Sequence, residues 1–153
     1  MRKLVVSLVL LCLGAATGCG SMALFKPRIA LGELSFDVAP DANDDTPFAL
    51  ELVAVSDDDV LKKLQELTAA QWFDPQANWR RDYPQAIQTW YYELTPDRHW
   101  PLAQPLPFAR RPARALLLFA NYKTPGAHRL RLESFKKARV LFAASGISVD
   151  PVP

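Results

Sequence analysis

The chain has 153 residues, enough for one domain of ordinary size, and half of its residues are apolar. Its 18 basic and 16 acidic residues give a formal net charge of +2. This near balance argues against a nucleic-acid-binding protein, which would carry a clear basic excess.

The N-terminal segment has the three parts of a secretory signal. Arg2 and Lys3 supply positive charge, residues 4–13 are almost wholly apolar, and small residues follow. The apolar run is well short of the roughly 20 residues that a membrane-spanning helix needs. We therefore expect residues 1–18 to be a cleaved leader. Ala-Thr-Gly-Cys at residues 16–19 resembles the lipobox of bacterial lipoproteins; the alternative is an ordinary cleavage site beside an incidental cysteine.

Lipidation of Cys19 would determine where the protein works. Acyl chains on this cysteine would insert into membrane lipid and tether the protein without embedding it. By resemblance, Gly20 in place of an aspartate points to the outer membrane, with the domain in the periplasm. Because Cys12 leaves with the leader and Cys19 is acylated, no disulfide is predicted. The loss of Arg2 and Lys3 leaves 16 basic and 16 acidic residues in the mature chain.

The mature chain is predicted to be a short lipidated tether, residues 19–27, followed by one domain at residues 28–153. Alternating apolar residues predict a strand within residues 29–38 and another at 48–55. The segment between them, residues 39–47, is rich in the Pro, Asn and Asp that turn a chain. These two strands and their acidic loop are the clearest pair in the sequence.

A helical insert is predicted at about residues 57–83. Ser56 and the three aspartates that follow it suit a helix start, since their oxygens cap free backbone N–H groups. The same aspartates would also suit a metal ion, but the glycine and distal glutamate of a calcium loop are missing, so capping is favoured. An apolar stripe at helical spacing follows: Val60, Leu61, Leu64 and Leu67.

Further strands are predicted after the insert. Residues 113–122 are almost continuously apolar, which is typical of a central strand buried on both faces. The proline-rich residues 96–112 are predicted to be extended and irregular. The other expected strands are residues 86–94, 128–133, 138–144 and an edge at 147–149. Six or seven short strands separated by turns indicate a mainly β, antiparallel two-sheet β-sandwich.

Groups able to carry out catalysis are scarce. His99 and His128 are the only histidines, no serine lies in a strand–turn–helix elbow, and no cysteine remains as a nucleophile or zinc ligand. We therefore predict that the protein is not an enzyme and binds no cofactor or metal.

Two surface features admit binding alternatives. The aromatic residues between Trp90 and Trp100 would suit a ligand platform, but alternation sends Trp90 and Tyr92 to one face, which favours the core. Arg110, Arg111 and Arg114 would suit an anionic surface, the alternative being a solvated loop.

Charge is distributed unevenly along the sequence. Residues 19–66 hold ten acidic and four basic residues, whereas residues 67–153 hold six acidic and twelve basic ones. This asymmetry is relevant to docking, unless the two parts pack side by side and neutralise each other.

The order of the mature elements resembles the outer-membrane lipoproteins of type VI secretion systems, the TssJ/SciN family. The matching pieces are residues 36–38, Asn-Asp-Asp-Thr-Pro at 43–47, the strand 48–55, the leucine-rich and aromatic stretch 61–73, and residues 114–122. The chain departs from the family at Val-Ser-Asp after the second strand, where a Tyr-Gln-Leu-like continuation is usual, and at its end, which lacks an aromatic and basic finish.

The resemblance implies a transthyretin-like sandwich with a structural role. Such a lipoprotein holds the periplasmic domain of an inner-membrane subunit, TssM, at the outer membrane, and its first loop contributes to the contact. Carried over to this chain, that loop corresponds to Asp41, Asn43, Asp44, Asp45 and Thr46. The alternatives are a merely solvated turn at this loop and, for the whole protein, a periplasmic ligand-binding or inhibitor lipoprotein.

Overall fold

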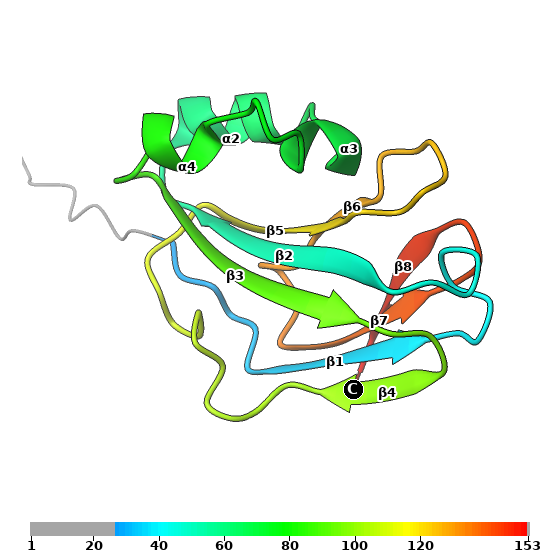
Figure 1. The fold of residues 1–153 in the computed structure, drawn as a ribbon. Helices are drawn as coiled ribbons and strands as arrows, with labels where there is room; N and C mark the ends of the chain where they lie inside the picture. Colours follow the sequence, from blue (N-terminus) through cyan, green and yellow to red (C-terminus); the bar gives the residue numbers. More distant parts are fainter. Residues whose placement is uncertain (1–26, 153) are drawn as a thin grey trace, which may run out of the picture.

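The computed structural model describes residues 27–152; the leader, Cys19 and most of the tether lie outside the described residues. The domain consists of two four-stranded sheets (Figure 1). One sheet has the order β4-β1-β7-β8, with β1 at Glu33–Val38, β4 at Arg98–Pro101, β7 at Lys137–Phe142 and β8 at Ile147–Pro151. The other has the order β3-β2-β5-β6, with β2 at Phe48–Val55, β3 at Ile87–Leu94, β5 at Ala115–Ala120 and β6 at Arg129–Arg131. The predicted β-sandwich is confirmed.

Two details of the strands differ from the sequence analysis. Strand β4 lies within residues 96–112, which were predicted to be irregular, and it raises the number of strands to eight. Its four residues are all exposed on a sheet edge, so they carry no alternation that would reveal a strand. The second difference is that β1 pairs with β7 in parallel, while the other ladders are antiparallel.

The main core lies between the sheets and follows from the alternation in the strands. Leu34, Phe36 and Val38 of β1 point inward, as predicted. The Phe36 ring meets Tyr92 and Phe142 edge to face, with centroid distances of 5.9 and 5.7 Å. These contacts join β3, β1 and β7, so aromatic rings hold the two sheets together.

The helical insert covers the outer face of the β3-β2-β5-β6 sheet, and a second, smaller core lies between the helices and this sheet (Figure 1). It consists of α2 (Asp58–Leu64), α3 (Ala69–Trp72) and α4 (Trp79–Asp82). The Asp57 side chain accepts hydrogen bonds from the backbone N–H groups of Asp59 and Val60, at 3.0 and 2.9 Å, which confirms the capping interpretation. Helices on one face and the sandwich core on the other explain why every residue of β5 is buried. Within residues 27–152, no helix has the length and apolar character to cross a membrane.

One buried carboxylate links this helical layer to the sheet. Glu51 of β2 is only 1% exposed and lies on the outer face, under the helices. It accepts hydrogen bonds from Trp72 Nε1 at 2.8 Å and from Arg80 Nη2 at 2.7 Å. Trp72 also stacks on Phe119 of β5, with ring centroids 5.0 Å apart. Glu51 thus connects two of the short helices to the central strands.

Candidate functional site

The loop between β1 and β2, residues 39–47, lies at one end of the sandwich, on the right in Figure 1. The backbones of three other connections form hydrogen bonds with it there. The Asn43 N–H donates to the Ala144 carbonyl at 3.2 Å, and the Asp97 N–H donates to the Ala39 carbonyl at 3.4 Å. The Lys123 N–H donates to the Asn43 side-chain oxygen at 2.6 Å. The loop is therefore hydrogen-bonded to the β3–β4, β5–β6 and β7–β8 connections.

The shape of the loop depends on a buried asparagine. Asn43 is 2% exposed, and its Nδ2 donates to the carbonyl oxygen and to Oγ1 of Thr46 at 3.2 and 3.0 Å. Asn43, Asp44 and Asp45 have φ angles of 51°, 59° and 49°. A run of three non-glycine residues in the left-handed region is unusual, and Asn and Asp tolerate that region best among such residues. The residue types and the buried hydrogen bonds together support this conformation.

The five residues predicted for this site therefore occupy different positions. Asp41, Asp44 and Asp45 are exposed, Thr46 is half-buried, and Asn43 is buried inside the loop. The five residues form one polar stretch of the sequence, in which position alone does not separate the buried asparagine from the exposed acids. The Asn-Asp-Asp run is a signal for left-handed backbone, but all three of its residues adopt that conformation, so the signal does not single out Asn43.

The exposed groups give this end of the sandwich an acidic surface. Asp97, in the adjacent β3–β4 connection, adds a fourth exposed carboxylate to the three of the loop. The cation paired with the loop is Lys123, whose Nζ lies 3.9 Å from Asp44 Oδ2. Such an exposed pair contributes little to stability. The geometry suits contact with a basic protein surface, since several exposed carboxylates lie on connections whose backbones are hydrogen-bonded to the loop.

Tyr122 lies at the same end of the sandwich, next to Lys123 in the β5–β6 connection. Its hydroxyl donates to the Ala143 carbonyl at 2.9 Å, and its ring stacks on His128 with centroids 4.8 Å apart. Burial of the hydroxyl, with a smaller contribution from the negative charge of Asp41, raises the pKa of Tyr122 to about 12. The folded state therefore favours the neutral phenol, since the ionised form would be desolvated beside an acid.

This raised pKa predicts an alkaline loss of stability. The stabilisation is present below the ordinary tyrosine pKa of about 10 and is lost as the pH rises toward 12. Tyr122→Phe should cost about 1 kcal/mol at pH 8 through the lost hydrogen bond. The wild type should then lose stability relative to the variant by up to about 1.4 kcal/mol per pH unit above pH 10. Urea unfolding at pH 8 and pH 11 measures the difference; equal losses in both proteins would contradict the assignment.

The aromatic residues of β3 and β4 do not form one shared surface. Trp90 meets Phe108 edge to face at 5.4 Å, and Tyr92 meets Phe36, so both rings pack against the main core as the alternation predicted. Trp100 instead is 42% exposed on the edge strand β4. The cavity that Trp100 lines includes neither of the other two rings.

Each histidine has a packing partner that accounts for its position. His99 is exposed on β4, and its Nδ1 contacts the carboxylate of Asp37 on the neighbouring strand. His128 is buried against Tyr122, and its Nε2 donates to the Thr124 carbonyl at 2.9 Å. Neither position requires a catalytic role.

No protein-family model matches the sequence, and no curated protein matches it. Solved structures with the same fold include the type VI secretion lipoprotein TssJ1 of Pseudomonas aeruginosa, with a TM-score of 0.61, 16% identity, and coverage of 79% of this chain and 95% of that one. Serratia marcescens Lip, a membrane-bound component of the type VI secretion system, has a TM-score of 0.52 and 16% identity, over 77% of this chain and 95% of that chain.

A third similar fold comes from a structure of the type VI secretion protein TssM C-terminal domain from EAEC. Its TM-score is 0.59 at 11% identity, and the alignment covers 78% of this chain and 97% of that chain. At these identities the likeness concerns the fold. The resemblance to TssJ/SciN lipoproteins, drawn from the order of the sequence elements, is confirmed at that level.

Proposed function

We propose that this chain is a TssJ/SciN-type lipoprotein and a non-enzymatic anchoring and docking subunit of a type VI secretion envelope complex. The observation that carries the proposal is the shared fold, which covers 95% of the chain in both TssJ1 of Pseudomonas aeruginosa and Serratia marcescens Lip. The lipobox-like sequence ending at Cys19 adds an independent feature of the same class. Neither feature depends on the other, since the lipobox precedes the folded domain.

In this proposal the acylated Cys19 anchors the domain in the outer membrane, facing the periplasm. Pro27, the first described residue, lies eight positions after Cys19. An extended chain of that length spans at most about 28 Å. The domain therefore remains close to the membrane surface.

The proposed partner is the periplasmic domain of an inner-membrane subunit of the TssM kind. The contact surface is the β1–β2 loop, with Asp41, Asp44 and Asp45 directed to solvent and Asn43 and Thr46 maintaining its shape. Because three carboxylates lie on one loop, we expect the complementary surface of the partner to be basic. Charges at the rim of an interface act mainly on association rate and specificity.

Neutralising the three exposed acids tests this contact. The variant Asp41→Asn, Asp44→Asn, Asp45→Asn removes the charge while keeping residues that tolerate positive φ. We expect its affinity for the cognate TssM-like domain to fall about ten- to a hundredfold in moderate salt, and by less in high salt because the charges are screened. Surface-immobilised, acylated full-length protein in lipid nanodiscs provides the binding measurement.

A matched control carries the same charge change elsewhere. Glu66→Gln, Asp82→Asn and Asp150→Asn alter three exposed acids that form no ion pair within residues 27–152. This control should bind as the wild type does. Equal affinity of both variants would place the contact elsewhere on the sandwich, and no binding by the wild type would remove the secretion proposal.

A further inference from the structure

Arginine side chains gather at the end of the sandwich opposite the acidic loop. Arg28, Arg110 and Arg111, named here the arginine face, are all exposed. Arg28 Nη1 donates to the Arg110 carbonyl at 3.2 Å, and the Ile29 N–H donates to the Arg111 carbonyl at 3.1 Å. Two segments more than 80 positions apart in the sequence therefore place their arginines side by side.

Several acidic groups near this end already have partners. Asp58 pairs with Arg114 at 3.3 Å, Glu33 with Lys137 at 3.2 Å, and Glu133 with Arg131 at 2.5 Å. Asp57 caps α2. Within the described part of the chain, the three arginines of the face form no ion pair with a carboxylate. The face is thus a local excess of positive charge in a mature chain of balanced composition.

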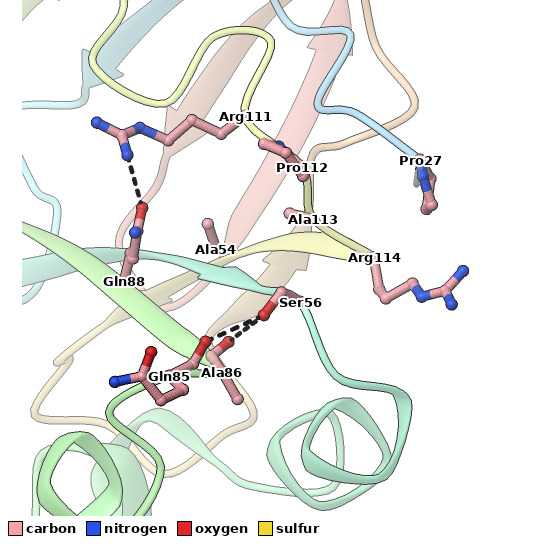
Figure 2. Close-up of a pocket in the computed structure, with 10 residues that line it drawn as sticks. All are labelled: Pro27, Ala54, Ser56, Gln85, Ala86, Gln88, Arg111, Pro112, Ala113 and Arg114. Carbon is pink, nitrogen blue, oxygen red and sulfur yellow. Dashed lines mark hydrogen bonds between the residues drawn. The ribbon is translucent and has the colours of Figure 1, made fainter. Parts of the chain in front are cut away.

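A cavity of about 350 Å³ adjoins the arginine face (Figure 2). Its lining includes Pro27, Ser56, Gln88 and Arg111. The Arg111 guanidinium donates to Gln88 Oε1 at 3.0 Å and to the Pro107 carbonyl, which fixes its position at the rim. The Ala113 N–H donates to the Pro27 carbonyl at 3.0 Å, so the chain enters the domain beside the segment that carries Arg111 and Arg114. In Figure 2, Pro27 lies on the side of Arg114, and the Arg111 guanidinium points the other way, toward Gln88.

We propose that the arginine face binds anionic phospholipid headgroups of the membrane in which the protein is anchored. This inference rests on the proposed lipid anchor at Cys19. The tether ends at the face and is at most about 28 Å long, so the arginines can reach the membrane surface. Each basic residue near an anionic surface strengthens association by about fivefold, so three contribute about a hundredfold.

Docking in this way would orient the protein. The acidic loop lies at the opposite end of β2, and eight strand residues extend over about 26 Å. With the arginine face on the membrane, the loop points away from the anionic surface and toward the periplasm. The basic end of the domain would then face the membrane, and the acidic end would face the periplasm.

Fluorescence energy transfer to headgroup-labelled lipid can measure this orientation in the acylated full-length protein. A donor dye is attached to Ser134→Cys, between β6 and β7 on the arginine side, or to Ser145→Cys, between β7 and β8 on the loop side. Acylation of Cys19 leaves the introduced cysteine as the labelling site. In vesicles of phosphatidylcholine with phosphatidylglycerol, transfer from position 134 should exceed that from 145 at least twofold. In phosphatidylcholine alone the two should be nearly equal.

Variants distinguish docking from tethering alone. Arg28→Gln, Arg110→Gln and Arg111→Gln together should remove the difference between the two labels in anionic vesicles. Arg110→Glu should do so as well, and its side chain makes no hydrogen bond within residues 27–152, so it keeps the proposal testable if the triple variant is unstable. The control Arg81→Gln, Arg98→Gln, Arg139→Gln removes three exposed arginines from other surfaces and should preserve the difference.

The lipid anchor is assessed first, by flotation with neutral vesicles. Failure of the wild type to float would overturn the anchor and, with it, this inference. If the wild type floats but its two labels transfer equally in anionic vesicles, the anchor stands and the headgroup site is wrong. The headgroup site is also wrong if the control loses the difference as fully as the arginine-face variants do.

Discussion

Replacing Asn43 with alanine is expected to lower the free energy of unfolding by about 3 kcal/mol. The substitution removes the acceptor of the Lys123 N–H and the donor to Thr46 in a buried setting, where each unsatisfied group costs roughly 1–3 kcal/mol. It also places alanine at a φ of 51°, which costs about 1 kcal/mol more. Urea unfolding monitored by circular dichroism gives the value.

Asp44→Ala is the matched control for the backbone contribution. Asp44 has a φ of 59° in the same loop but is exposed, and its side chain makes only the long pair with Lys123 within residues 27–152. Its loss should be near 1 kcal/mol. If the two variants were equally stable, the buried hydrogen bonds of Asn43 would contribute nothing and its proposed positioning role would be wrong.

The Asn43 variant also separates shape from charge at the proposed interface. Asn43→Ala keeps all three exposed carboxylates of the loop but removes the contacts that set their positions. Under conditions where the variant remains folded, its affinity for the TssM-like domain should fall despite unchanged charge. A carboxylate set that is no longer held in place must be ordered on binding, which costs affinity.

Elements with a simple period could be predicted from the sequence. The alternation in β1 and β2, the unbroken apolar run of β5 and the capped start of α2 each reflect one local physical cause. Strand β4 could not be found in this way, because an exposed edge strand carries no alternation between buried and solvated residues. Its identity depends on backbone pairing with β1, 60 or more positions earlier.

The β1–β2 loop was predictable in location but not in construction. The composition of residues 39–47 identified a polar loop between two strands. The inward turn of Asn43 depends on Lys123, 80 positions later, and on Ala144. The charge asymmetry was visible as two unequal parts of the sequence. Its division into an acidic loop end and an arginine face follows from strand directions, which the local pattern does not contain.

Glu51→Ala is expected to destabilise the domain by about 3 kcal/mol. Glu51 is 1% exposed, and its carboxylate accepts hydrogen bonds from both Trp72 and Arg80. Its removal therefore leaves a buried indole N–H without an acceptor and opens a cavity under the helices. Breaking a buried pair costs about 3–5 kcal/mol, and the lower end applies because the Arg80 side chain is 60% exposed and remains hydrated. Thermal and urea unfolding measure the loss.

Glu51→Gln distinguishes the roles of shape and charge in this link. The amide oxygen can still accept from Trp72 and fills the same volume, so only the charge-assisted bonds to Arg80 are lost, at about 1–2 kcal/mol. Because Glu51 and Arg80 belong to the helix-covered face, whereas the acidic loop lies at a strand end, the folded Gln variant should bind the TssM-like domain like the wild type. Equal destabilisation by Ala and Gln would assign the whole effect to charge. A weakened partner contact in the folded Gln variant would instead place the helical layer in the interface.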